Sequence, residues 1–348
     1  MHAPTQAPVR LNLYSDTQTR PTSAMRQAMA EAECGDEQNF DDPTVNALCE
    51  RVAALLGKEA AVFMPSGTMC NEIAILVHVR PGEEIIAHET AHIVCSEGGG
   101  PAALAGAMIR TLTGPGGQYD AAAMLEAIRH HPSRYEPKTR LVEVEQTANM
   151  GGGTVWPLER ISAVGRAARA RGLATHIDGA RLMNAVVAAG VTAKDFAAEF
   201  DTVWVDFTKG LGAPVGAVLA GPRDFIDEAW RWKQRMGGAM RQAGIIAAGC
   251  LHALDHHIDR LAEDHANAKT LARDLAQIPG VAVTPPETNL VFAEIGRPAQ
   301  PVADAARAQG LRISITGPQR IRLCTHLDVT AAHCAEAAGI LRSILAPR

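Results

Sequence analysis

The feature that most restricts the fold of this chain is a regular alternation of strand and helix patterns from about Pro21 to about Leu219. Short apolar or β-branched runs predict buried strands, and the longer runs between them carry apolar residues at helical spacing. The predicted strands lie at residues 60–67, 83–88, 108–113, 139–146, 174–180, 202–208 and 215–220. The predicted helices include residues 21–33, 44–57, 68–79, 158–172 and 181–190. Strands separated by helices form a mainly parallel sheet covered on both faces, which binds ligands beyond the carboxyl ends of its strands.

The pattern changes at about Gly244, where a long helical stretch begins and continues to residue 278. Short strands and helices then alternate less regularly, and they are predicted at residues 281–283, 289–295, 301–310, 320–326 and 331–345. We therefore predict a large domain over residues 1–245 and a smaller α+β domain over residues 246–348.

Composition excludes several classes of partner. The chain has 348 residues with 33 Lys and Arg against 38 Asp and Glu, and this net charge of −5 gives no basic footprint for nucleic acid or a membrane surface. No apolar run reaches about 18 residues, and the N-terminal stretch lacks the pattern of a secretory signal. The seven cysteines form no C-x-x-C pair, which is typical of reduced thiols. We expect a cytoplasmic protein that binds neither nucleic acid nor membrane.

Residues 88–92 read His-Glu-Thr-Ala-His, which matches the H-E-x-x-H pattern of zinc proteases. That chemistry needs a helix that places both histidines one turn apart on one face. Here the pattern follows a β-branched run and precedes three glycines at residues 98–100, which would break a helix. We expect His88 to end a strand and His92 to begin a loop or helix, and we assign no metal. A zinc hydrolase that uses these two histidines stays an alternative, which elemental analysis for stoichiometric zinc would test.

The strongest chemical signal is Lys209, which follows the apolar strand Val203–Phe207 and precedes a glycine-rich turn. A lysine in such a place is unfavourable unless it is paired, deprotonated or used covalently, and partial burial lowers its pKa toward that of a nucleophilic amine. Asp178 ends another predicted strand, and Arg181 follows it closely. This combination suits pyridoxal phosphate, because a carboxylate can keep the ring nitrogen of that cofactor protonated and an arginine can bind a substrate carboxylate.

A third part of the pattern is Ser66-Gly67-Thr68, where a predicted strand turns into a helix. Backbone N–H groups and the helix dipole make such a turn a phosphate cradle. Each of the three parts is a weak signal alone, but their order along one α/β domain predicts a pyridoxal phosphate site.

These residues resemble the threonine aldolase group of pyridoxal-phosphate enzymes, which is related to the aromatic β-eliminating lyases. The resemblance runs from about Leu11 to the C-terminus. The stretches that carry it are SDTQTRPT, GDEQNFDDPT, FMPSGTMCN, HIDGAR, TKGLGAPVG, GGAMRQAG and RIRLCTHLDV. It implies a type I, aminotransferase-like α/β fold with a mainly parallel seven-stranded sheet and a smaller α+β C-terminal domain. It also implies a homo-oligomer that is a dimer of dimers.

The resemblance implies cofactor-binding roles at the matching positions. Lys209 would hold pyridoxal phosphate covalently, and Asp178 would face its ring nitrogen. The turn Ser66–Thr68, which includes Gly67, would bind the phosphate together with Arg241 of a neighbouring subunit.

The resemblance also assigns the substrate side of the site. Arg181 and Arg322 would bind the carboxylate of the amino acid substrate with help from Ser15, and Arg181 would also border the cofactor. His92 would stack on the cofactor ring close to the substrate side chain. Glu97 would take part in proton transfer, directly or through a water.

Two departures from the family concern this substrate side. The family more often has Thr-His-Asn where this chain has Thr147-Ala148-Asn149, and that histidine commonly approaches the substrate hydroxyl. The family also tends to have Tyr-Gly where this chain has Asn39-Phe40. These changes leave the cofactor chemistry intact and bear on side-chain specificity.

The resemblance therefore implies retro-aldol cleavage of L-threonine, L-allo-threonine or a related L-β-hydroxy-α-amino acid to glycine and an aldehyde. His92, or a water held by His92 and Glu97, would take the β-hydroxyl proton. β-Elimination or dehydration of a hydroxyamino acid with the same cofactor stays an alternative, which the missing histidine favours more than in other members. A non-catalytic family member is a further alternative, against which the intact cofactor residues argue.

Overall fold

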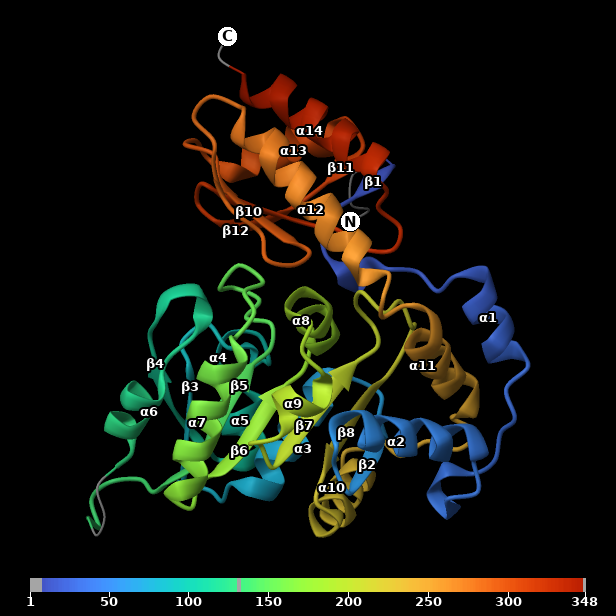
Figure 1. The fold of residues 1–348 in the computed structure, drawn as a ribbon, viewed down its shortest axis with the longest axis vertical. Coiled ribbons are helices and arrows are strands. Elements are labelled where there is room, and N and C mark those ends of the chain that lie inside the picture. The colour runs from blue at the N-terminus through green and yellow to red at the C-terminus, as the bar shows by residue number, and fades with distance from the viewer. Residues whose placement is uncertain (1–7, 130–132, 347–348) are drawn as a thin grey trace, which may run out of the picture.

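A seven-stranded sheet forms the centre of the large domain in the computed structural model of the protein (Figure 1). The structure describes residues 8–129 and 133–346, so the first seven residues of the N-terminal stretch lie outside the described ranges. The strand order is β2-β8-β7-β6-β5-β3-β4, and β8 runs antiparallel to both of its neighbours while the other pairs are parallel. This arrangement confirms the predicted, mainly parallel seven-stranded sheet. The strands are β2 (Ala60–Met64), β3 (Glu84–His88), β4 (Met108–Leu112), β5 (Thr139–Glu145), β6 (Ala174–Asp178), β7 (Thr202–Asp206) and β8 (Ala217–Gly221).

Helices cover both faces of this sheet because successive strand residues point to opposite faces. In β7, Val203 and Val205 join the core on one face, whereas Trp204 between them joins the core on the other. The helices that contribute to the first core include α2 (Pro43–Leu56), α6 (Ala121–Ala127), α7 (Leu158–Ala170), α8 (Leu182–Ala189), α9 (Ala193–Ala197) and α11 (Gly244–His256). Those of the other face are α3 (Gly67–His78), α4 (His92–Cys95), α5 (Gly100–Ala105) and α10 (Arg223–Arg235). Burial on both faces explains why the strands read as nearly continuous apolar runs.

The smaller domain is built on a four-stranded antiparallel sheet of order β12-β13-β10-β9, with a core of its own. Its strands are β9 (Ala282–Thr284), β10 (Leu290–Glu294), β12 (Ser314–Gly317) and β13 (Arg320–Cys324). Its helices are α12 (Leu261–Ala276), α13 (Ala299–Ala308) and α14 (Ala331–Leu345). The N-terminal strand β1 (Leu11–Asn12) crosses to this domain and pairs in parallel with β11 (Leu311–Arg312), as Figure 1 shows.

The prediction of one helical stretch over residues 244–278 is wrong, because the chain forms two helices there. α11 packs against α2 and against α1 (Ser23–Ala30), whereas α12 packs mainly against β9, β10 and α14 and also touches α8. Because the two helices pack mainly against different domains, the continuous helical pattern of the sequence is interrupted between them. At this turn the His257 ring hydrogen-bonds to the carbonyl of Leu211 at 2.7 Å. The predicted domain boundary near residue 245 stays a prediction.

Short 3₁₀ helices occur at Asp16–Gln18, Glu37–Asn39 and Pro115–Gly117. Within the described ranges, the helices lack the combination of length and apolar character that a membrane crossing requires.

Candidate active site

A cavity of about 350 Å³ opens at the carboxyl ends of the central strands. This is the edge at which α/β sheets bind their ligands. Its wall includes parts of the large domain, of the N-terminal segment and of β13 from the small domain. Nine of the eleven residues predicted for the site line it, namely Ser15, Ser66, Gly67, Thr68, His92, Asp178, Arg181, Lys209 and Arg322. Glu97 and Arg241 do not line it.

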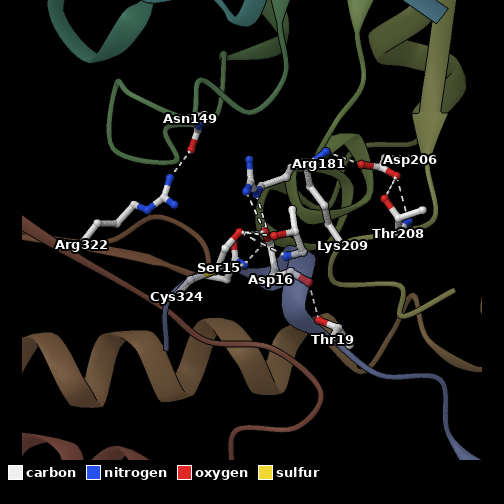
Figure 2. Close-up of polar contacts among 12 residues, drawn as sticks. Ser15, Asp16, Thr19, Asn149, Arg181, Asp206, Thr208, Lys209, Arg322 and Cys324 are labelled. Atoms are coloured by element: carbon white, nitrogen blue, oxygen red, sulfur yellow. Dashed lines mark hydrogen bonds and ion pairs between the residues drawn. The ribbon is translucent and has the colours of Figure 1, made fainter. Parts of the chain in front are cut away.

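Lys209 reaches the cavity because the chain turns directly after β7, which is buried along its whole length. Its ammonium group forms an ion pair with Oδ2 of Asp206 (Figure 2). Oδ1 of the same carboxylate accepts hydrogen bonds from the backbone N–H and the hydroxyl of Thr208, both at 2.8 Å. The side chain of Lys209 is 20% exposed, whereas that of Asp206 is buried. A fixed anion therefore holds a reachable amine at the cavity wall.

Asp178, the last residue of β6, presents an oriented carboxylate to the same cavity. Its Oδ1 accepts from the N–H of Ala180 at 2.9 Å, and its Oδ2 accepts from the side-chain amide of Asn71 at 2.8 Å. Asn71 is fixed in turn, because its Oδ1 accepts from the indole N–H of Trp204 at 2.7 Å. Burial raises the pKa of Asp178, whereas the charge of His92 and the hydrogen bond from Asn71 lower it.

The zinc-like pattern does not form a helix. β3 ends at His88, and α4 begins at His92, which confirms the expectation for both residues. The two ring nitrogens of His88 contact the hydroxyl of Thr90 at 2.9 Å and the carbonyl of Gly114 at 3.2 Å. His88 therefore serves the loops around the strand end and is not paired with His92.

His92 lies on the cavity wall with Glu97 behind it. The Nδ1–H of His92 donates to Oε1 of Glu97 at 2.7 Å, and the amide of Asn71 donates to the same oxygen at 2.7 Å. The hydrogen bond to Glu97 raises the pKa of His92 above its ordinary value against the effect of burial. One atom from each of His92, Glu97 and Asp178 lies within 4.8 Å of the others, so the three could hold a cation. Since hydrogen bonds with Asn71 and with one another already use these atoms, we assign no metal.

The N-terminus of α3 supplies backbone donors to the cavity. Ser66 is the N-cap residue, and its hydroxyl accepts from the N–H of Met69 at 3.2 Å. The N–H groups of Gly67 and Thr68 belong to the first helical turn, which lacks partners inside the helix, so they can bind an anion. Position 67 requires glycine, because a Cβ atom there would lie 2.2 Å from the ring of Trp204.

Arg181 lies on the cavity wall and is bound to a buried carboxylate. Its Nε and Nη2 donate to the two oxygens of Asp16 at 2.8 and 2.7 Å (Figure 2). Burial alone would raise the pKa of Asp16, but the paired Arg181 holds it well below its usual range. Among the described residues, no acceptor contacts Nη1 of Arg181, so this nitrogen can reach a ligand.

Arg322 approaches from β13 of the small domain. Its Nη1 donates to Oδ1 of Asn149 at 2.9 Å, and its Nε is buried without an acceptor among the described residues. An unsatisfied buried donor on a charged side chain is unfavourable, and a ligand carboxylate would satisfy it. Ser15 lines the same cavity, and its hydroxyl accepts from the hydroxyl of Thr17 at 2.9 Å.

Comparison with known proteins shows the family and the fold of the chain. Residues 12–297 match the family described as beta-eliminating lyase. The low specificity L-threonine aldolase of Escherichia coli K12 is 40% identical over 97% of this chain and 99% of its own length. The chain belongs to the threonine aldolase group of the beta-eliminating lyase family.

Two solved structures show the same fold at lower identity. The Leishmania major threonine aldolase has a TM-score of 0.84 at 21% identity and covers 97% of this chain and 100% of its own. The Rhodobacter sphaeroides aspartate aminotransferase has a TM-score of 0.73 at 15% identity and covers 99% and 94%. The aminotransferase-like fold is thereby confirmed.

Three residues to which the family resemblance drew attention do not line the cavity of this threonine aldolase group member, namely Arg241, Phe40 and Ala148. Arg241 is 62% exposed and pairs with Asp36 at 2.7 Å on the surface. Phe40 is exposed, and its ring packs edge-on against Trp230 with centroids 5.3 Å apart. Ala148 is buried and does not line the cavity.

Sequence reasoning missed three residues that organise the site of this family member. Asp206 holds Lys209, Asp16 holds Arg181, and Asn71 bridges the carboxylates of Asp178 and Glu97. Asp206 could have been noticed, because an aspartate is unusual at the end of a buried apolar strand. Asn71 lies in an ordinary helical pattern and gave no such signal.

Proposed function

We propose that this chain cleaves L-threonine, L-allo-threonine or a related L-β-hydroxy-α-amino acid to glycine and an aldehyde, with pyridoxal phosphate held at Lys209. The observation that carries the proposal is the convergence of an amine, a buried carboxylate and a helix N-terminus on one cavity, in a chain 40% identical to a low specificity L-threonine aldolase.

The residues of the cavity fit pyridoxal phosphate. Lys209 offers a reachable amine, Asp178 a buried anion for the ring nitrogen, and the N-terminus of α3 donors for the phosphate. When bound, this cofactor withdraws electrons from the α-carbon of an amino acid, so that a bond to that carbon can break. Asp206 holds the side chain of Lys209 at the cavity wall, where the cofactor would bind.

The arginines orient the substrate. The buried Nε of Arg322 and the open Nη1 of Arg181 point to a substrate carboxylate, which Ser15 helps to position. Fixing the carboxylate at two points determines which bond of the α-carbon faces the cofactor and therefore which bond breaks. The bidentate pair with Asp16 holds Arg181 rigid for this task.

His92 takes the proton of the β-hydroxyl group. Because Nδ1–H of His92 donates to Glu97, the lone pair of the neutral ring is on Nε2. Nε2 can then accept the hydroxyl proton as the bond between the α- and β-carbons breaks. With Ala148 outside the cavity, His92 is the imidazole on the described cavity wall.

Product analysis tests the proposal directly. We expect purified protein supplied with pyridoxal phosphate to release glycine and an aldehyde from the isomers of threonine, allo-threonine or phenylserine. The L-isomers should react and the D-isomers should not. Ammonia and a 2-oxo acid as the products would instead indicate β-elimination, and a protein that takes up no pyridoxal phosphate would contradict the proposal altogether.

We also propose that the functional unit is a homo-oligomer, a dimer of dimers, in which Arg241 completes the phosphate site of a neighbouring chain. The exposed position of Arg241, away from the cavity of its own chain, supports this role. Co-expression of Lys209→Ala chains with Arg241→Ala chains should therefore restore activity that neither variant has alone. Random pairing gives about one quarter of wild-type activity, because half of the dimers are hybrids and each hybrid has one intact site. Activity no higher than the sum of the two separate variants would contradict a shared site.

A further inference from the structure

Glu72, a residue of α3 that no step above uses, places a second carboxyl group behind His92. The residue is 3% exposed, and neither of its carboxyl oxygens has a donor among the described residues. The carboxyl group occupies the space left by Gly100 at the start of α5, because a Cβ atom on that glycine would lie 1.8 Å from Oε1 of Glu72. An ionised carboxylate in such a place would be strongly unfavourable.

Glu72 lies close to Glu97, because its carboxyl group packs against Gly100, whose N–H donates to the backbone carbonyl of Glu97 at 2.9 Å, and because the adjacent Asn71 donates to Oε1 of Glu97. The side chain of Glu97 is buried, and its two carboxyl oxygens differ in their partners. Oε1 accepts from His92 and from Asn71, whereas Oε2 has no donor among the described residues. Two carboxyl groups close together away from water cannot both be ionised, so the pair holds one proton.

The donors around the pair decide where this proton lies. The ring of His92 and the amide of Asn71 stabilise a negative charge on Glu97, whereas no comparable donor from the described part of the chain faces Glu72. Glu72 is therefore the protonated partner, and its O–H can donate to the orphaned Oε2 of Glu97. Burial and the charge of Glu97 accordingly raise the pKa of Glu72 to about 8.

We propose that Glu72 is a positioning residue, whose proton bridges to Glu97 and thereby fixes the hydrogen bond between Glu97 and His92. Three donors then hold the Glu97 carboxylate: His92, Asn71 and Glu72. A carboxylate held in this way keeps the Nδ1–H of His92 oriented, so that Nε2 stays the ring nitrogen that meets the substrate hydroxyl. This inference rests on the proposed function for its effect on catalysis, but the shared proton itself does not.

Two substitutions separate a hydrogen-bond role from a packing role. Glu72→Gln keeps the shape and still donates an N–H to Glu97, whereas Glu72→Met keeps the length and donates nothing. We expect Glu72→Met to lower kcat about 10- to 100-fold, the usual effect of losing a hydrogen bond to a charged group or an outer partner of a catalytic residue. KM for the amino acid should stay within about twofold, because the arginines are untouched, and Glu72→Gln should keep kcat within about threefold of wild type. Equal kcat values for the two variants would overturn the positioning role.

Infrared spectroscopy of the cofactor-free protein tests the proton without any assay of activity. At neutral pH, the wild-type spectrum minus the Glu72→Gln spectrum should contain the carbonyl band of a protonated carboxylic acid. A difference spectrum that contains only carboxylate bands would overturn the shared proton. If the acid band is present but no variant cleaves hydroxyamino acids, the carboxyl pair stands and the proposed function fails. Circular dichroism confirms that both variants are folded.

Discussion

Replacing Lys209 with arginine or alanine is expected to lower the cleavage rate roughly 10⁴-fold or more, the scale seen when an enzyme loses a covalent group. Neither side chain can form the covalent link to the cofactor aldehyde. The visible absorbance of bound pyridoxal phosphate should disappear together with the activity. The measurements are kcat with saturating substrate and the absorbance spectrum after removal of free cofactor.

Arginine is the more informative substitution, because it keeps a cation beside the buried carboxylate of Asp206. Alanine leaves that carboxylate without its partner, which is strongly unfavourable for a buried anion. Lys209→Arg should therefore retain more of the wild-type thermal stability than Lys209→Ala while losing the same activity. Lys269→Ala, at an exposed position on α12, is the control and should change neither property. A Lys209→Arg protein with more than a tenth of wild-type kcat would exclude a covalent role for this lysine.

Asp178→Asn is expected to have the second-largest effect, a fall in kcat of about 10²- to 10⁴-fold. The asparagine fills the same volume but has no charge to hold the ring nitrogen of the cofactor protonated. Removing one partner of a buried ion pair costs about 3–5 kcal/mol, which corresponds to this range of rates. The cofactor should still bind, because Lys209 and the N-terminus of α3 are unchanged, but its absorbance spectrum should shift.

Asp201→Asn is a matched control for this substitution. Asp201 accepts hydrogen bonds from the backbone N–H and the hydroxyl of Thr175, and it precedes β7 at the edge of the sheet away from the cavity. Its replacement should leave kcat within about twofold of wild type, as for most substitutions outside a site. If Asp178→Asn kept wild-type kcat and spectrum, the charge of Asp178 would have no part in the reaction.

The fold was largely predictable because its signal is local. Buried strands and amphipathic helices have different periods, and their alternation alone leads to a mainly parallel sheet. The antiparallel direction of β8 could not be predicted, because a buried apolar run reads the same in either direction. The break between α11 and α12 was missed for a related reason, since it depends on which domain each helix packs against.

The candidate site was likewise predictable from the sequence only in part. Lys209 and Asp178 each follow a strand, and parallel strands present their carboxyl ends at one edge, so topology alone brings these residues together. Two of the residues that hold the site are distant in sequence from their partners: Asn71 is 107 positions from Asp178, and Asp16 is 165 positions from Arg181. No local pattern predicts such pairs, because they depend on how helices and segments pack after the sheet has formed.

The pairing of β1 with β11 sets an order of events during synthesis. Leu311, the partner of Leu11, is synthesised 300 residues after it. Contacts between residues so far apart in sequence are slow to form, because a long loop must close first. Ser15 and Thr17 come shortly after β1 and line the cavity, so this part of its wall is completed last. A nascent chain therefore carries Lys209 for some time before the cavity that this lysine lines is complete.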